Sequence, residues 1–539
     1  MNMDFVVKKI GKGEFLENKI VKKTLTVGLF LLLLFLAGIK LYSAASFNSP
    51  HEFRETNIVA FAKMFAEGKN PYSLSTLNEE IPVVTSQYGF LVPLLLAPFV
   101  KIGRIFGFSH LQVCQIITII VELLGALLAY LIILKNSKNS LLSIAGTIVI
   151  YSCYWRYAAF GGTFPDQYGV TLSLLLLYFV NSLKESKRHN YICIIIICIM
   201  LFYVKQYFVF NIVGLSVYLF FYSRRDFLKF IIYGTIFGVI SAVLVTKIFP
   251  LYFPEAIVLT SGTVGNAGWE YSLKQIKTIG WKFYPLISVA YVALICAYTL
   301  SLVRKFKSKS EYEKQKLPSY ATVQSICILP IVIVLSLNIG TYWTYYLQLW
   351  WIYVILTVFE KMPELHAKSI VSAFFLAITL MRIAPLVVEK PLNLEQKHNW
   401  EITYKFLDHY SRQGDILVSP HLSAYCLEHQ ISTSDYGQAE FNSSGNLNRY
   451  LKNKIWSIVF PKTELILTKN ITYNDKILEN IKNQKYSAVV LTDMGRYWLK
   501  EEDLEKSGYK KTNEFILVTG TQHWKTIFYV VSKGTPTFQ

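Results

Sequence analysis

Two acidic residues and one lysine are unusual because each lies beside a long apolar run, where charged side chains are scarce. Glu55 follows the first apolar run, Asp166 lies in the short connection AFGGTFPDQYG, and Lys205 lies between MLFYV and YFVFNIV. An ionised group beside hydrocarbon is costly unless it is paired or functional. Two carboxylates and a lysine suit a reaction in which a base deprotonates a hydroxyl group and a cation neutralises a phosphate leaving group.

Each of these residues also has an ordinary structural explanation. Glu55 could be a first-turn acid paired with Arg54, and Asp166 could be a cap or a turn residue for the helix that follows it. Lys205 could reach along the membrane to its surface, although basic residues are scarce on that side. Glu122 lies inside an apolar run, and it is better explained as a satisfied contact between helices than as a catalyst. The sequence leaves the first three explanations open.

Membrane-spanning helices must position these groups. The chain has 539 residues, of which 53% are hydrophobic and 17% are charged. Soluble domains carry about 25% charged residues, and here runs of roughly 18 or more apolar residues account for the deficit. The net charge of +19 comes from lysines and arginines in short connections between these runs. That pattern is typical of cytoplasmic loops and argues against nucleic-acid binding.

The distribution of basic residues predicts about eleven spans, with the N-terminus in the cytoplasm and the C-terminal region outside. The expected spans are about 24–43, 110–134, 140–159, 168–183, 190–204, 208–222, 228–248, 282–303, 320–338, 346–359 and 369–388. The apolar stretch 88–106 contains Pro93 and Pro98 and ends in Lys101 and Arg104. If it crossed the membrane, every later loop would change side. We therefore expect it to lie in the outer interface.

The stretch FRETNIVAFAKMFAEGKNPYSLS predicts a short amphipathic helix on the same outer side. Its expected apolar face consists of residues at helical spacing: Ile58, Phe61, Ala62 and Phe65. Asn57, Lys63 and Glu67 are expected to lie away from that face. Gly68 and the following Asn-Pro pair end the helix. Glu55 lies in its first turn, where the helix N-terminus favours a carboxylate.

Residues 391–539 have the patterning of a soluble domain, which follows a membrane domain of residues 1–390. NWEITYKFLDHYSRQG predicts a helix that ends at Gly414, and DILVS, SAVVLTD and TIFYVVS predict strands. Helices mixed with strands indicate a small α/β domain. Cys426 is the only cysteine in this region, which excludes a disulfide within it.

Several well-known functional motifs are missing from the sequence. The chain has no phosphate-binding glycine loop, no HExxH, no GxSxG and no visible inverted repeat. No CxxC pair or Cys/His cluster suggests zinc, and no Asp-x-Asp pair marks another metal. No cofactor is predicted with certainty, and a divalent metal is left open.

The order of these motifs resembles the GT-C glycosyltransferases, integral membrane enzymes that use sugars linked to polyprenyl phosphate or diphosphate. The chain is most similar to the bacterial branch related to protein O-mannosyltransferases and aminoarabinose transferases. RETNIVAFAKMFAEGKNPY resembles the family's acid followed by a helix, Gly and Tyr. QYGFLVPLLLAPFVKIG resembles the start of its second juxtamembrane helix. FPDQYGVTLSLLLLYF, KQYFVF and YYLQLWWIY resemble its Pro-Asp, its Lys-Gln and its late outer-loop tyrosines.

The resemblance covers roughly residues 20–390 and implies an all-α membrane domain of about eleven transmembrane helices plus outer juxtamembrane helices. It implies transfer of a sugar from a polyprenyl-phosphate-linked donor to a glycan, lipid or protein on the outer face of the plasma (inner) membrane. The catalytic residues would be Glu55, as the base, and Asp166, which orients the acceptor or shares the role. The substrate-binding residues would be Arg54, Tyr88, Lys205, Gln206, Tyr345, Tyr346 and Gln348.

The chain also departs from the family pattern. Arg54 stands where the family often has Asp, Phe90 replaces a usual Pro, and Phe164 replaces a frequent Arg or His. Which acid is the base is therefore open. A transporter or flippase of lipid-linked sugars is the alternative from another class, but it would need polar groups at mid-membrane and usually an internal repeat. A polymerase of lipid-linked saccharides would share the chemistry of the transferase.

Overall fold

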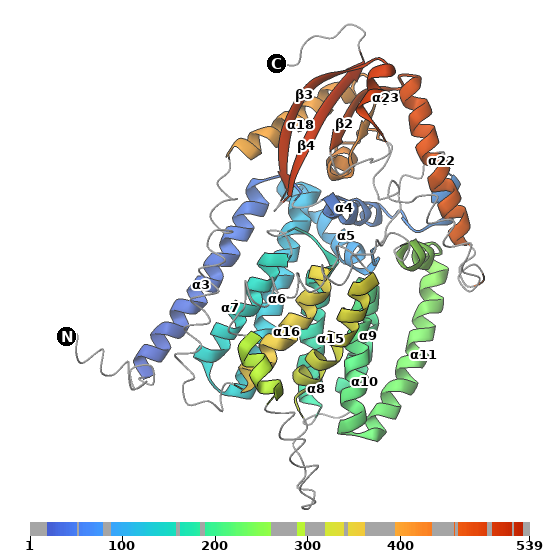
Figure 1. Cartoon of the computed structure of the whole chain (residues 1–539). Helices are drawn as coiled ribbons and strands as arrows, with labels where there is room; N and C mark the ends of the chain where they lie inside the picture. The colour runs from blue at the N-terminus through green and yellow to red at the C-terminus, as the bar shows by residue number, and fades with distance from the viewer. Residues whose placement is uncertain are drawn as a thin grey trace, which may run out of the picture.

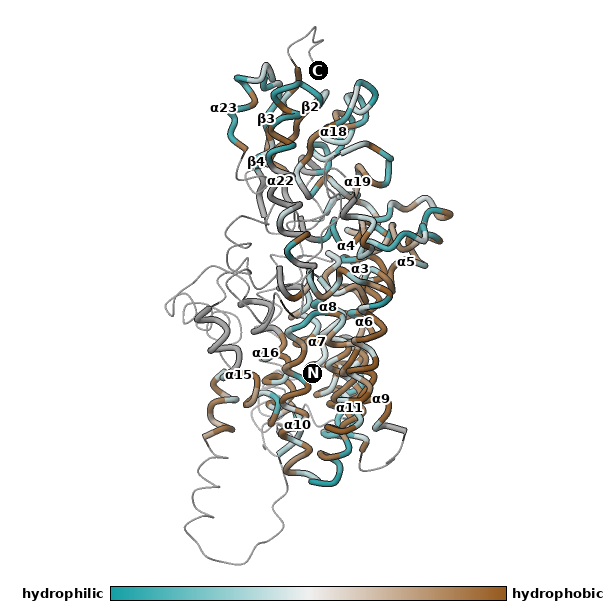
Figure 2. The backbone as a smooth tube through the Cα atoms, turned by 90° about the vertical axis from the view of Figure 1, so that its right-hand side faces the viewer, coloured by the Kyte–Doolittle hydropathy of each residue, from teal (hydrophilic) through white to brown (hydrophobic). Residues whose placement is uncertain are grey.

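A computed structural model of the whole chain places a small sheet domain at one end of a bundle of helices (Figure 1). Hydrophobic residues dominate the bundle, and hydrophilic residues are more frequent in the sheet domain (Figure 2). The structure describes residues 19–50, 53–78, 88–157, 162–183, 189–259, 288–296, 318–338, 343–361, 394–433, 458, 462–492, 499–519 and 522–531. The predicted span 369–388 lies outside the described residues, as does most of 282–303.

The helices of the bundle coincide with the other predicted spans. They are α3 (Lys19–Ser46), α6 (His110–Ser137), α7 (Ser140–Tyr157), α8 (Pro165–Ser182), α9 (His189–Val204), α10 (Phe210–Tyr222), α11 (Arg224–Ile248), α15 (Tyr320–Asn338) and α16 (Trp343–Lys361). In the part of the chain that the structure describes, α3, α6 and α11 are long and apolar enough to cross a membrane. Shorter apolar stretches lie in α7, α9, α10, α15 and α16.

At the end of the bundle away from the sheet domain, polar side chains join the termini of several helices. Lys135 Nζ donates to Ser182 Oγ at 3.3 Å, and Asn136 Nδ2 donates to Glu360 Oε1 at 2.8 Å. Ser319, just before α15, also donates to Glu360. The ends of α6, α8 and α16 and the start of α15 therefore meet there, as the alternation of basic loops predicts. Placing this end in the cytoplasm rests on the sequence and stays a prediction.

Two short helices lie across the opposite end of the bundle, beside the sheet domain: α4 (Phe53–Ala66) and α5 (Leu91–Gly103) (Figure 1). A 3₁₀ turn, η2 (Arg104–Phe106), and Gly107 with φ of 75° end this segment. Ser109 then caps α6, because its hydroxyl accepts from Gln112 N while Gln112 Oε1 accepts from Ser109 N. Since α5 lies at the end where α6 begins, the segment 88–106 does not span the bundle, as predicted. Its place in the outer interface stays a prediction.

The helix α4 differs from the prediction of one apolar and one polar face. Residues 55–63 are all buried, including Asn57 and Lys63. On one side α4 packs against α5 and α6, and on the other it packs against η8 (Pro420–Leu422) and α19 (Ser423–Glu428) of the sheet domain. The prediction is wrong for Asn57 and Lys63, because segments more than 300 positions later pack against α4, whereas Glu67 is exposed as predicted.

The C-terminal region is the expected small α/β domain. Its strands are β1 (Asp415–Val418), β2 (Tyr486–Thr492), β3 (Tyr509–Thr519) and β4 (Gln522–Val531), in the order β1-β2-β4-β3. β1 and β2 are parallel, and the other neighbouring pairs are antiparallel. The helix α18 (Leu394–Ser411) packs into one apolar cluster of the sheet, and α22 (Lys462–Lys482) and α23 (Glu501–Lys506) pack into another. The three predicted strands are confirmed, and β3 was missed.

Candidate active site

Asp166 lies in the first turn of α8, which begins at Pro165. Its carboxylate is buried and accepts from Lys205 Nζ at 3.1 Å on Oδ1 and 2.9 Å on Oδ2. The Tyr207 hydroxyl donates to the same Oδ1. The cap residue of α8 is Phe164, so Asp166 is not the helix cap, which was one of its two ordinary explanations. A carboxylate with two oxygens bound to one ammonium is a strong, charge-assisted contact.

Lys205 lies between α9 and the short 3₁₀ segment η4 (Gln206–Val209). Its side chain is 16% exposed, against 3% for Asp166. The ammonium nitrogen lies 5.5 Å from the centroid of the Tyr88 ring and 5.2 Å from that of Tyr207, which suits cation–π contact. The lysine therefore turns inward to Asp166 and does not reach along the bundle to a membrane surface. Three predicted site residues, Asp166, Lys205 and Tyr88, lie together.

Glu55 approaches the same place from α4. It is fully buried, and its Oε1 accepts from the backbone N–H of Thr163 at 2.6 Å. Thr163 lies three residues before Asp166, in the connection between α7 and α8. The structure thus brings both predicted acids to one short connection, although they are 111 positions apart in the sequence.

The other predicted binding residues are distributed differently. Gln206 Nε2 donates to Ala256 O at 2.8 Å, in the π-helical turn η5 (Pro254–Leu259), so it joins the α9–α10 connection to the segment after α11. The backbone of Arg54 lies in α4, beside Glu55. The backbones of Tyr345, Tyr346 and Gln348 lie in the first turns of α16. The side chains of these three residues and of Arg54 lie outside the described part of the structure.

Two residues in or near this cluster were missed by sequence reasoning. Tyr207 is one, and its position two residues after Lys205 in KQY was the available signal. Lys40 is another: its Nζ lies 2.6 Å from Glu122 Oε2, and both side chains are 0% exposed. This pair confirms that Glu122 is a satisfied contact between helices. The signal for Lys40 was a single lysine near the outer end of the first span.

An apolar cavity of about 420 Å³ lies between α9 and α11. Small residues on α11 leave room for it, among them Gly234, Gly238 and Ala242, opposite Ile199 and Phe202 of α9. One wall is closed by a hydrogen-bonding contact of 3.1 Å between Tyr203 Oη and Ser241 Oγ. Tyr203 lies two residues before Lys205, so this apolar cavity adjoins the segment that carries the cation.

Within the described residues, no three His, Cys, Asp or Glu side chains are grouped in a way that could hold a metal ion. Among the described residues, two carboxylates, one ammonium group and phenol rings lie together, beside an apolar cavity.

No protein-family model and no curated protein matches the chain. Solved structures do: the chain is similar to ArnT from Cupriavidus metallidurans, both bound to undecaprenyl phosphate and in the apo state. The TM-scores are 0.55 and 0.59 at 12% and 11% identity, over 95% of this chain and 99% of ArnT. The protein has a GT-C-like fold. At this identity the likeness establishes the fold alone, and in this GT-C-like fold the acids and the lysine gather where the bundle meets the sheet domain.

Proposed function

We propose that this protein is a membrane glycosyltransferase that uses a polyprenyl-phosphate-linked sugar. It would transfer the sugar to a hydroxyl group of a glycan, lipid or protein on the outer face of the plasma (inner) membrane. The observation that carries the proposal is the convergence of Glu55, Asp166 and Lys205 on one buried connection in a GT-C-like fold. The similar ArnT structure holds undecaprenyl phosphate, which supports a donor of that class.

The donor would be held by Lys205 and by the apolar cavity beside α9. A polyprenyl chain is apolar, and the cavity between α9 and α11 is lined mainly by apolar side chains. Lys205, two residues beyond Tyr203, would then meet the phosphate with its ammonium group. Because Lys205 already binds Asp166, the arriving phosphate would share that cation with the carboxylate. Donor binding would thereby be coupled to the position of Asp166.

The transfer itself forms a bond between the acceptor oxygen and the anomeric carbon and breaks the bond from that carbon to the phosphate oxygen. The acceptor proton would pass to Glu55, and the electron pair of the broken bond would leave on the polyprenyl phosphate, beside Lys205. Both oxygens of Asp166 already accept hydrogen bonds from Lys205 or Tyr207, which suits orientation better than proton removal. Glu55, which is held at the same connection by Thr163 N, is proposed as the base.

Binding of the lipid provides the first test. Purified protein in detergent should bind undecaprenyl phosphate, measured by native mass spectrometry, and Lys205→Ala should weaken that binding at least tenfold. Lys247→Ala is the matched control, because Lys247 is an exposed lysine at the sheet-domain end of α11. Equal binding by wild type and Lys205→Ala would remove the proposed role of Lys205.

Reconstitution separates the transferase from a transporter. Proteoliposomes that contain radiolabelled undecaprenyl-phosphate sugars should release free undecaprenyl phosphate when glycan, lipid or protein acceptors are supplied. Movement of the labelled lipid between leaflets, without release of undecaprenyl phosphate for any donor, would favour a flippase and contradict the proposal.

A further inference from the structure

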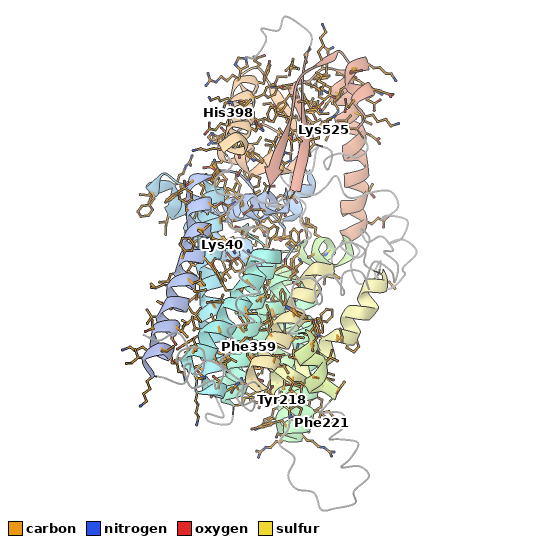
Figure 3. The ribbon with its side chains drawn as sticks, turned by 60° about the vertical axis from the view of Figure 1, so that its left-hand side comes forward. Lys40, Tyr218, Phe221, Phe359, His398 and Lys525 are labelled. Carbon is orange, nitrogen blue, oxygen red and sulfur yellow. The ribbon has the colours of Figure 1, made fainter. Side chains whose placement is uncertain are left out.

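A buried ion pair lies inside the bundle, close to the candidate active site but outside it. Lys40 Nζ of α3 lies 2.6 Å from Glu122 Oε2 of α6, and 5.6 Å from the centroid of the Tyr151 ring of α7. Figure 3 shows Lys40 on α3 nearer to the sheet domain than Tyr218, Phe221 and Phe359. A charged pair buried within a membrane bundle is costly to maintain unless it has a function.

The second carboxylate oxygen of Glu122 connects the ion pair to α8. Glu122 Oε1 accepts from Gln167 Nε2 at 2.9 Å, and Gln167 is itself fully buried. The same amide nitrogen donates to Gly162 O at 2.8 Å, and Gln167 Oε1 accepts from Phe164 N at 2.8 Å. Gln167 therefore binds the backbone on both sides of Thr163.

This backbone is the connection to which both proposed acids are attached. Thr163 N donates to Glu55 at 2.6 Å, and its hydroxyl is contacted by Thr118 Oγ1 at 3.3 Å. Asp166 directly precedes Gln167 in the first turn of α8. A shift of Gln167 would consequently move the N–H group that holds Glu55 and the turn that carries Asp166.

We propose that Lys40, Glu122 and Gln167 are positioning residues that fix the 162–167 connection and so hold Glu55 and Asp166 in place for transfer. This inference rests on the proposed function for its kinetic consequence. Lys40 neutralises Glu122, so that the carboxylate remains in place as an acceptor for Gln167. Without Lys40, an unbalanced carboxylate would be buried between α3, α6 and α8, and it would move or recruit water. A displacement of about 1 Å at reacting groups costs about a hundredfold in rate.

The test compares Lys40→Met with the double variant Lys40→Met/Glu122→Gln. Lys40→Met should lower kcat at least tenfold while the protein still binds undecaprenyl phosphate. The double variant should return kcat to within threefold of wild type, because a Gln at position 122 leaves no buried charge and its amide oxygen still accepts from Gln167. Lys135→Met, at the far end of α6, controls for loss of a lysine.

Hydrogen–deuterium exchange gives a readout that does not depend on the reaction. Peptides covering residues 162–168 should exchange faster in Lys40→Met than in wild type, and the double variant should restore slow exchange. Unchanged exchange in Lys40→Met would overturn the inference, even if the protein proved not to be a transferase.

The kinetic outcomes are equally decisive. Turnover by Lys40→Met within twofold of wild type would show that the pair only joins helices. A double variant as slow as Lys40→Met would show that the charges themselves are needed, which also contradicts a positioning role. A wild-type protein that transfers no sugar would refute the proposed function, while the exchange experiment would still decide the role of the pair.

Discussion

Lys205 and Asp166 form an ion pair in which both carboxylate oxygens lie within 3.1 Å of the ammonium nitrogen. The pair joins the start of α8 to the connection between α9 and α10, and the Tyr207 hydroxyl closes the cluster. Lys205, which could have been an ordinary interface lysine, is thus paired with Asp166, which could have been an ordinary helix cap. The pairing makes each residue's role depend on the other, and mutations of the two must be interpreted together.

Loss of Lys205 should affect the reaction more than the fold. Lys205→Ala removes the cation proposed to stabilise the departing phosphate, a contribution of about 3–4 kcal/mol per donor group in other enzymes. Turnover should fall about a hundredfold or more, measured as release of undecaprenyl phosphate, while the protein still inserts and purifies. Near-normal turnover would show that the pair with Asp166 is structural only.

Tyr207 should contribute through its hydroxyl alone. Tyr207→Phe keeps a ring that stacks on Phe208 at 4.4 Å between centroids but removes the hydrogen bond to Asp166. Hydrogen bonds to charged groups contribute about 1.5–3 kcal/mol, so kcat should fall at least about tenfold. Tyr218→Phe, at the opposite end of the bundle, should leave kcat unchanged. An unchanged kcat in Tyr207→Phe would show that the hydroxyl does not contribute to catalysis.

The sidedness of the chain can be measured directly. The N-terminus is expected in the cytoplasm and residues 391–539 outside, because basic residues gather at the end of the bundle away from the sheet domain. Alkaline phosphatase fused after residue 390 should be active, since it works only in the exported compartment. Activity of a cytoplasmic reporter at the same position would reverse the orientation.

Docking of the sheet domain on α6 should depend on pH through Glu428. Its Oε2 accepts from His110 N at 3.1 Å, and burial raises its pKa from the ordinary value of 4.5 despite that bond and the nearby Arg104 and Lys63. A carboxyl with a raised pKa in the folded state binds its proton more tightly there, so the contribution of Glu428 to stability falls as pH rises above about 4.5.

The substitution Glu428→Gln removes that titration but keeps an oxygen to accept from His110. The variant should melt at a higher temperature than wild type at about pH 8, and the difference should shrink toward about pH 5. Thermal unfolding of the purified protein at several pH values measures this. A constant difference across that range would show that the pKa of Glu428 is not raised in the docked state.

The sequence predicted the elements well where the signal was local or depended on charge. The helices of the bundle, and the failure of α5 to span it, followed from apolar length and from the position of basic residues. The outward placement of Lys205 stays a prediction. The three contacts of Gln167, by contrast, depend on atoms of Gly162, Phe164 and Glu122 that only the folded chain brings together. No pattern in the sequence links those positions.

Two errors have a common cause in long-range packing. Asn57 and Lys63, which were predicted to lie on a polar face of α4, are buried, and η8 and α19 pack against this helix. No periodicity within residues 53–67 records a partner more than 300 positions away. The strand β3 begins with the polar stretch YKKTNE, which lacks strand alternation, and it forms because β4 pairs with it along its length. In both cases, contacts with distant segments overrode the local sequence pattern.

Glu55 and Asp166 provide the sharpest test of the mechanism. Glu55→Gln keeps an oxygen that accepts from Thr163 N but removes the basicity that an acceptor hydroxyl needs, so transfer should be abolished while undecaprenyl phosphate binds normally. Asp166→Asn removes the charge that faces Lys205, so it should reduce transfer and also change the affinity for undecaprenyl phosphate. The two variants should therefore differ in their affinity for undecaprenyl phosphate as well as in turnover. An active Glu55→Gln with an inactive Asp166→Asn would exchange the two roles, and activity in both would refute the catalytic assignment.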